Sequence, residues 1–312
     1  MRQFIRNILM LGVLGGTGCS HTPDLPNSII PAGCRLGLAT YTYEGYSDST
    51  AYEYDSFGHL TKTTAIRKEK GRITRQISQF FGFGPDHYLN SRTDRITTYT
   101  NGLPTITEGA FVYEYQGTPK QIQSIRRISG TVPNDSPWTT TYQYTGNQLS
   151  QYREVAASGT LLTEISVGSD GRPIRIQQPK FQLIDLTNGL ISRTVSGKDT
   201  TRYTYDAQGQ ITNQTISYGD TGERIERTIS YDNRLPIRTG ELRFKGFPES
   251  DLSANGRARS NVQTETIRRY RSGFLIESSI LQYNYAYNAQ NYPTGYARSD
   301  GSRARFYYTN CP

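Results

Sequence analysis

The sequence is poor in several residue types, and each shortage excludes a class of protein. Its 312 residues include three cysteines, three histidines, two methionines and one tryptophan, and 34% are hydrophobic. This is too little apolar sequence for a polytopic membrane protein, because each membrane span needs about 20 apolar residues. The histidines do not occur at a metal-ligand spacing such as His-x-x-x-His, and there is no Gly-x-Ser-x-Gly elbow. We therefore expect no metal, no cofactor and no catalytic residue.

Tyrosine and glycine are abundant instead. The chain has 24 tyrosines, 30 glycines and a net charge of +8, with 20% charged residues. This charge is too modest for a chain kept disordered by its charges, and tyrosine rings provide surface that can be half buried. The composition predicts a folded, all-β chain. The excess of arginine fits acidic polysaccharide or lipid headgroups as partners, because arginine matches carboxylate and phosphate geometry; nucleic acid is not expected.

The N-terminus has the pattern of an export signal. Arg2 and Arg6 flank a short positive segment, an apolar stretch follows from Ile8 to Leu14, and small residues come next. The apolar stretch is too short to span a bilayer. We predict a signal peptide over residues 1–18.

The cysteine after these small residues points to a lipid anchor. Thr17, Gly18 and Cys19 resemble the lipobox of bacterial lipoproteins, in which the thiol is lipidated, although Gly16 replaces the usual leucine. The resemblance implies lipidation at Cys19 and an outer-membrane lipoprotein of a Gram-negative cell envelope, facing the periplasm or the surface. The alternative is a secreted protein in which Cys19 has no role.

The segment after Cys19 reads as a tether, and the two other cysteines bracket the rest of the chain. Residues 19–33 contain Pro23, Pro26 and Pro31 and no periodicity, and could extend about 45 Å. Cys34 and Cys311 are predicted to form a disulfide, because an isolated pair in an oxidising compartment is more often a disulfide than a metal site. Residues 34–312 are predicted to be a single β-repeat domain.

A Tyr-x-Tyr pair followed by a turn is the most specific internal signal. Its clearest copies run over residues 52–60 and 203–211. The tyrosines at i and i+2 point to one face of a strand, an aspartate accepts backbone hydrogen bonds at the first turn position, and a glycine three residues later suits the end of a type I turn. Each copy therefore predicts a β-hairpin. The turn residues are Tyr54, Asp55 and Gly58 in one copy and Tyr205, Asp206 and Gly209 in the other.

Weaker copies recur along the chain. Tyrosine pairs precede turns at residues 113–117, 142–147 and 283–288, and pairs such as Asn-Gly mark turns at residues 99–103, 169–171, 187–190 and 270–274. Between the turns lie runs rich in Thr, Ile, Ser and Arg, over residues 61–77, 122–128, 223–230 and 262–270. Their partial alternation indicates antiparallel strands, whereas β-branched residues and glycines disfavour a helix over residues 72–81.

These motifs resemble the YD repeats of RHS-type proteins, whose hallmark is a Tyr-Asp pair followed by a glycine and an apolar residue. The match is good at Tyr54-Asp55-Gly58-Leu60 and at Tyr205-Asp206-Gly209-Ile211, and loose elsewhere from Tyr41 to Tyr308. Where the family often has arginine after the glycine, this chain has His59 and Gln210. The resemblance is closest to small YD-like lipoproteins of Gram-negative envelopes. Because a lone hairpin cannot bury its apolar face, we expect the hairpins to join into one long, twisted or curled antiparallel sheet.

Three functions follow from this interpretation. The first is a membrane-anchored binding or structural module of the envelope, without catalysis, whose partner is a polysaccharide or an envelope protein. The second is carbohydrate recognition by aromatic stacking, for which Trp138, Tyr142 and Tyr144 are the candidate residues. The third is an envelope hydrolase, because paired carboxylates meet in space and not in sequence.

Overall fold

The structure is a computed structural model that describes most of the predicted β-repeat domain. The described residues are 35–130, 139–146, 148–156, 159–168, 173–178, 182–188, 190–236 and 260–309. The predicted signal peptide and tether, Cys19, Cys34, Trp138, Cys311 and the turn at residues 169–171 lie outside these ranges. Within them, every regular element is a β-strand, which confirms the predicted all-β class.

The chain forms twenty strands. The first ten are β1 (Arg35–Tyr43), β2 (Tyr46–Tyr54), β3 (Leu60–Glu69), β4 (Arg72–Phe83), β5 (Leu89–Thr100), β6 (Leu103–Gln116), β7 (Gln121–Gly130), β8 (Thr139–Thr145), β9 (Gln148–Ala156) and β10 (Gly159–Val167). The others are β11 (Pro173–Gln178), β12 (Gln182–Thr187), β13 (Leu190–Ser196), β14 (Asp199–Tyr205), β15 (Ile211–Ser217), β16 (Glu223–Tyr231), β17 (Val262–Arg271), β18 (Phe274–Tyr287), β19 (Pro293–Arg298) and β20 (Arg303–Thr309).

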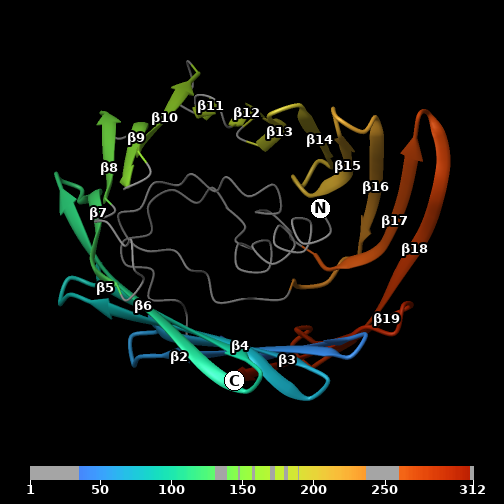
Figure 1. Cartoon of the computed structure of the whole chain (residues 1–312), viewed down its shortest axis with the longest axis horizontal. Coiled ribbons are helices and arrows are strands. Elements are labelled where there is room, and N and C mark those ends of the chain that lie inside the picture. Colours follow the sequence, from blue (N-terminus) through green and yellow to red (C-terminus); the bar gives the residue numbers. More distant parts are fainter. Residues whose placement is uncertain are drawn as a thin grey trace.

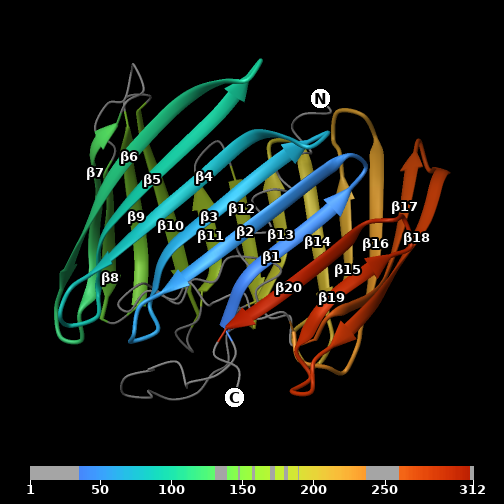
Figure 2. The same ribbon diagram turned by 90° about the horizontal axis from the view of Figure 1, so that it is seen from below.

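The sheet closes on itself. Each strand pairs antiparallel with the next, and β20 pairs with β1 from Arg35↔Thr309 to Thr42↔Arg303. Figure 1 shows the strands following one another around a ring, and Figure 2 shows them tilted together along its wall. The expected antiparallel sheet of successive hairpins is therefore present, and it is a closed barrel rather than an open ribbon. Closure gives both end strands a partner.

The two ends of the barrel have different turns. At one end, the short-turn rim, odd strands are joined to the even strands that follow, in several cases by two-residue turns such as Asn101-Gly102 and Ser272-Gly273. Both residues of each pair have positive φ, 54° and 83° in one pair and 51° and 83° in the other, which is the backbone of a type I′ hairpin turn. The same geometry occurs at Lys70-Gly71, so the predicted single run over residues 61–77 is two strands.

At the opposite end, the long-turn rim, even strands are joined to the odd strands that follow, in several cases by longer turns. In the turn from Asp55 to His59, the Asp55 N–H donates to the His59 carbonyl oxygen at 3.0 Å and the Gly58 N–H donates to the Asp55 carbonyl oxygen at 3.1 Å. The turn from Asp206 to Gln210 repeats both bonds. The Asp206 carboxylate also accepts the Gln210 N–H at 2.8 Å. The aspartates and glycines of the repeat therefore occupy the turn positions expected for them.

Gly58 should tolerate a side chain less well than Gly102 does. Both have positive φ, 91° at Gly58 and 83° at Gly102, so alanine strains either turn by about 1–2 kcal/mol. A Cβ at Gly58 would also lie 2.3 Å from the Arg35 guanidinium, whereas a Cβ at Gly102 meets nothing within 4 Å. We expect Gly58→Ala to lower the free energy of unfolding more than Gly102→Ala in urea titrations. Equal losses would show that Arg35 moves aside without cost.

Side chains alternate between the two faces of the wall, and one face is lined by tyrosine. The rings of Tyr52, Tyr142, Tyr203 and Tyr285 all project from this tyrosine face, where most of the core also lies. Neighbouring side chains converge on the concave face of a closed sheet and diverge on the convex face. The tyrosine face is therefore the inner face. Three clusters of buried residues lie along it: Leu149, Ile165, Ile176, Ile184, Leu186 and Ile191; Leu60, Phe81, Leu89, Tyr113 and Ile122; and Leu36, Ala39, Ala304 and Phe306.

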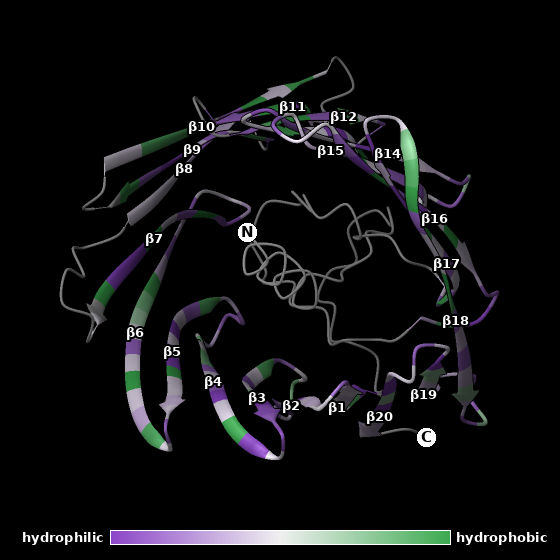
Figure 3. Cartoon of the chain, turned by 45° about the vertical axis from the view of Figure 1, so that its right-hand side comes forward, coloured by the Kyte–Doolittle hydropathy of each residue, from purple (hydrophilic) through white to green (hydrophobic). Residues whose placement is uncertain are grey.

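The outer face carries ion pairs between neighbouring strands. Lys62 pairs with Glu53 at 2.7 Å, Arg126 with Glu114 at 3.0 Å, and Arg175 with Asp185 at 3.0 Å. Figure 3 shows hydrophilic and hydrophobic segments alternating along β4 and β6. The outer face therefore carries charged pairs on several strands.

Candidate functional site

A repeated tyrosine contact holds the inner face together at the long-turn rim. The final tyrosine of an even strand donates its hydroxyl to a backbone carbonyl near the start of the preceding odd strand, at 2.5–3.1 Å. The five pairs are Tyr54 with Leu36, Tyr115 with Leu89, Tyr144 with Ile122, Tyr205 with Ile191, and Tyr231 with Ile211. The five acceptor residues are themselves buried. Since each such bond contributes about 1 kcal/mol net, the second tyrosine of the repeat has a structural role.

Tyr142 and Tyr144, two of the candidate stacking residues, lie in this inner wall. Both rings pack against two of the buried clusters, and the Tyr144 hydroxyl donates to the Ile122 carbonyl oxygen at 2.9 Å. Burial raises the pKa of Tyr144 to about 12. The structure thus shows packing contacts for these two rings, and their role in carbohydrate stacking stays a prediction.

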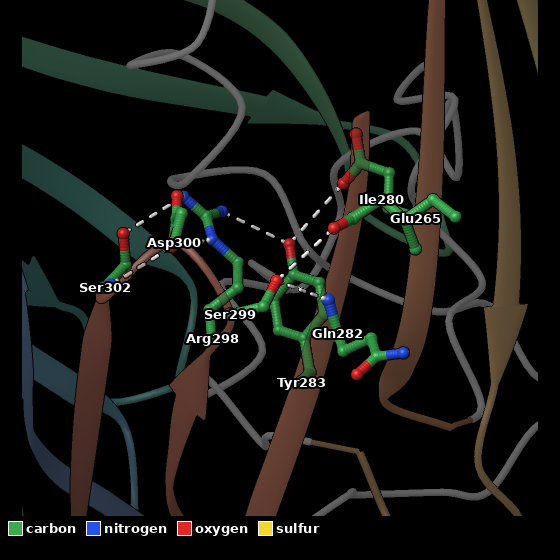
Figure 4. A network of polar contacts seen from close by, with 8 residues as sticks. All are labelled: Glu265, Ile280, Gln282, Tyr283, Arg298, Ser299, Asp300 and Ser302. Carbon is green, nitrogen blue, oxygen red and sulfur yellow. Dashed lines mark hydrogen bonds and ion pairs between the residues drawn. The ribbon is translucent and has the colours of Figure 1, made fainter. Parts of the chain in front are cut away.

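A polar network crosses the inner face from β15 to β19. The Arg227 guanidinium donates to the Glu265 carboxylate at 2.7 Å and to the Gln214 side-chain oxygen at 2.8 Å. The second Glu265 oxygen accepts the Tyr283 hydroxyl at 3.5 Å, and Arg298 donates to the Tyr283 oxygen at 3.3 Å. Figure 4 shows how Tyr283 links Glu265 to Arg298. Residues far apart in the sequence are thereby joined into one chain of contacts.

The far end of this network is a tight turn. The Arg298 guanidinium donates to the Asp300 carboxylate at 2.6 Å and to the Ser302 hydroxyl at 3.1 Å (Figure 4). The hydrogen bond from Arg298 holds the pKa of Asp300 well below its usual range. The same bond raises the pKa of Arg298. Both groups therefore stay charged at neutral pH, which suits a fixed ion pair and not a group that exchanges protons.

An aromatic cluster forms at the long-turn rim. The His59 ring stacks on Phe83 with centroids 4.6 Å apart and on His87 with centroids 5.0 Å apart. Phe57, which is 59% exposed, forms a T-shaped contact with the His87 ring, with centroids 5.0 Å apart. We name these four residues the rim cluster. No sequence pattern predicts that His59 and His87 meet, although both lie in turns between an even and an odd strand and such turns lie at one rim.

Hydrogen bonding fixes one histidine of the rim cluster. The His59 Nδ1 lies 2.8 Å from the Asp55 carboxylate, which also accepts the His59 N–H at 2.8 Å. Partial burial opposes ionisation of Asp55, but the hydrogen bonds from His59 keep the pKa of that carboxyl below its ordinary value. The aspartate of the YD-like turn therefore positions His59 as well as closing the turn.

One inward carboxyl differs from these ion-paired groups. Burial raises the pKa of Glu154, which lies opposite Thr140 and Leu161 in the sheet. A carboxyl group with a raised pKa is the type of group that a hydrolase uses as a general acid.

Within the ranges that the structure describes, no group of three or more His, Cys, Asp or Glu side chains could hold a metal ion. No helix of the described part is long and apolar enough to cross a membrane.

Comparisons with known proteins give likenesses of fold at low identity. No family model matches the chain, and no curated protein matches it. A porin-like protein from Bacteroides uniformis aligns over 88% of this chain and 98% of its own, with a TM-score of 0.39 and 9% identity. A porin-like protein from Bacteroides vulgatus covers 88% of this chain and 99% of its own, with a TM-score of 0.34 and 12% identity.

A third similar structure is the complex TcdB2-TccC3-Cdc42. The alignment covers 80% of this chain but only 15% of the matched chain of that complex, with a TM-score of 0.32 and 10% identity. Likenesses this distant do not assign the chain to a family. The functional argument therefore depends on the residues of the chain itself.

Proposed function

We propose that the chain is a lipid-anchored lipoprotein of a Gram-negative envelope, whose YD-like β-barrel acts as a binding or structural module without catalysis. The observation that carries this proposal is the charged outer face. Outer-face pairs such as Lys62–Glu53 and Arg126–Glu114 would face lipid if the barrel spanned a bilayer, where each lysine or arginine costs about 2–4 kcal/mol at the midplane. The outer face of the barrel is therefore suited to contact with water, and in this proposal a lipid on Cys19 attaches the protein to the membrane.

The inner face supports a structural role for the repeat. Its tyrosine hydroxyls bond to backbone carbonyls, and the Glu265 and Asp300 carboxylates are held by arginines. Groups fixed in this way stabilise the wall and do not turn over a substrate. The hydrolase alternative would depend on Glu154, and measurable hydrolysis of an envelope polysaccharide that Glu154→Gln abolishes would favour it over the proposal.

Removal of the Cys19 thiol tests the anchor directly. We expect Cys19→Ser to move the protein from the membrane fraction to the aqueous fraction of lysed cells, because the charged pairs of the outer face disfavour insertion of the wall into lipid. Cys34→Ser is the matched control and should remain in the membrane fraction. Immunoblots of the two fractions measure the distribution. If Cys19→Ser stays with the membranes as the wild type does, lipidation at this thiol is wrong.

A further inference from the structure

The barrel wall has an open strand edge within the described residues. β18 runs from Phe274 to Tyr287, but β19 pairs with it only from Tyr283 to Tyr287. On the other side of β18, β17 pairs with the stretch from Phe274 to Gln282, which β19 does not reach. In Figure 2 the β17–β18 hairpin extends past the turn that joins β19 to β20. The half of β18 near the short-turn rim therefore has a neighbouring strand, among the described residues, on one side only.

The backbone orientation of this edge follows from Gln282. Its carbonyl oxygen accepts the Ser299 N–H at 3.0 Å and its N–H donates to the Ser299 hydroxyl at 3.1 Å, so both groups point toward the β19 side. Alternate residues of a strand direct these groups the same way, so Ser278 and Ile280 also point theirs toward the open side, where the Ile280 carbonyl oxygen accepts the Ser299 hydroxyl at 3.4 Å (Figure 4). A bulge between Leu275 and Glu277 ends this regular stretch. The open edge thus covers Glu277 to Leu281.

The open edge carries neither lysine nor proline, although a bulge and the charged Glu277 lie at one end of it. Exposed edges commonly carry one of these two residues, which block strand pairing. The one charged group of the open edge, Glu277, is paired with Arg269 at 3.3 Å. Ile276 and Ile280, which flank Ser278 on either side, are 53% and 60% exposed. An accessible ladder with apolar side chains is the geometry that an added strand requires.

Charge on the outer face specifies what the added strand should contain. Arg268 lies opposite Ser278 in the β17–β18 register and its side chain is exposed. Glu226 lies opposite Arg268 on β16, but its ion pair is with Arg224 at 3.1 Å, and Arg268 has no ion pair among the described residues. A residue opposite Ser278 on an added strand would lie two strand spacings, about 10 Å, from the Arg268 backbone. The Ser278 side chain is small and would not block the space between them. An arginine and a glutamate side chain can meet across that distance. The residue opposite Ser278 should therefore be acidic.

We propose that the open edge of β18 binds an extended segment of a partner protein by β-strand addition. The bound segment lies antiparallel to β18, bonds to the Ser278 N–H and carbonyl oxygen and to the Ile280 N–H, places an acidic residue opposite Ser278, and places an aliphatic residue opposite Ile280. This inference rests on the binding role proposed above. It deepens that role because it names the class of partner.

A synthetic peptide tests the proposal on the purified full chain. The probe is a fluorescently labelled, end-blocked Thr-Ile-Thr-Glu-Thr-Val, which presents Ile, Glu and Val on one face in antiparallel register. We expect saturable binding by fluorescence anisotropy. Methylation of the peptide nitrogens that face β18 should abolish binding, because the ladder bonds are lost while the side chains remain. Absence of binding by the unmodified probe up to its solubility limit would overturn the proposal.

Substitutions in the protein separate strand addition from nonspecific adhesion. Ser278→Pro removes an N–H that faces the open side and leaves the bonds to β17, so it should weaken probe binding at least about tenfold without changing the circular dichroism spectrum. Ser278→Ala is the matched control and should bind within about twofold, since only backbone groups of residue 278 are used. Arg268→Glu should reverse the preference to a probe with lysine in place of glutamate, whereas Arg153→Glu, on the distant strand β9, should not. Equal binding by Ser278→Pro and wild type would exclude the open edge.

The same variants distinguish a second copy from a partner protein. Light scattering should show a monomer for the full chain; a dimer that Ser278→Pro dissolves would assign the edge to self-association and overturn the proposal. These measurements do not involve Cys19, so a failed anchor and a failed strand addition give different results.

Discussion

Arg227→Met should lower the free energy of unfolding by about 3–5 kcal/mol, because it leaves a buried carboxylate without its cation. Glu265 is 8% exposed, and its closest cationic contact is the Arg227 Nε at 2.7 Å. The remaining hydrogen bond, from the Tyr283 hydroxyl at 3.5 Å, is too long to replace that contact. Urea titration followed by circular dichroism measures the loss.

An exposed ion pair provides the control for this prediction. Lys198 and Asp220 lie 2.6 Å apart, but their side chains are 74% and 73% exposed. Lys198→Met should therefore change the free energy of unfolding by no more than about 1 kcal/mol, since water screens such pairs. The double variant Arg227→Met with Glu265→Leu should regain most of the lost stability, because no unpaired charge is then buried. If the double variant were no more stable than Arg227→Met, packing and not charge burial would explain the loss.

The local part of the fold could be predicted from the sequence because turn chemistry acts within a few residues. The repeat around Tyr205, Asp206 and Gly209 identifies the end of one strand, the turn and the start of the next. The turn at Lys70-Gly71 was not predicted, because lysine is uncommon at positive φ and the residues around it continue the Thr and Arg pattern of a strand.

Closure of the barrel could not be derived from the sequence. It depends on the pairing of Arg35 with Thr309, and apart from the predicted Cys34–Cys311 disulfide, which would join the first and last strands, no sequence pattern relates residues so far apart. An alternating pattern specifies which face of a strand is buried, but it does not specify how many strands complete a ring. The predicted curled sheet and the observed barrel therefore differ in one long-range contact, and that contact removes the free ends of the sheet.

The candidate sites had even weaker sequence signals. The network of Arg227, Glu265 and Arg298 consists of single charged residues on different strands, each of which reads as an exposed strand residue. His59 and His87 lie in separate turns and meet because both turns belong to one rim. The open edge of β18 follows from the shortness of β19 relative to β18, which the pattern of polar and apolar residues does not encode.

Alkaline pH should unfold the barrel between about pH 10 and pH 12, because its buried tyrosines resist ionisation. Burial raises the pKa of Tyr52, Tyr54 and Tyr231 from 10.0 to about 12, and burial is the first cause in each case. The folded chain thus keeps phenol protons that the unfolded chain releases above pH 10, so the free energy of unfolding is highest below pH 10 and falls as the pH rises through about 12.

Several tyrosines acting together make this effect large. A shift of two pKa units corresponds to about 2.7 kcal/mol at full titration, less for rings that water partly screens. A few such rings can therefore offset the whole stability of a typical domain, about 5–15 kcal/mol. Tyrosinate absorbance and far-ultraviolet circular dichroism should change together in one transition, since the phenols ionise when the wall opens. Tyrosine absorbance that titrates as free phenol near pH 10 while the β-sheet spectrum persists would contradict this prediction.

Two phenylalanine variants connect the alkaline transition to the inner face. Tyr52 packs on the inner wall, so Tyr52→Phe keeps the ring, removes one buried ionisable group and should move the midpoint of unfolding to higher pH. Tyr307 projects from the outer face of β20 and is 49% exposed, so Tyr307→Phe should leave the midpoint unchanged. The same substitution is made at both positions, and only the face of the wall differs. A shift at Tyr52 alone would therefore assign the pH dependence to the tyrosines that line the barrel interior, which are the residues that the repeat places there.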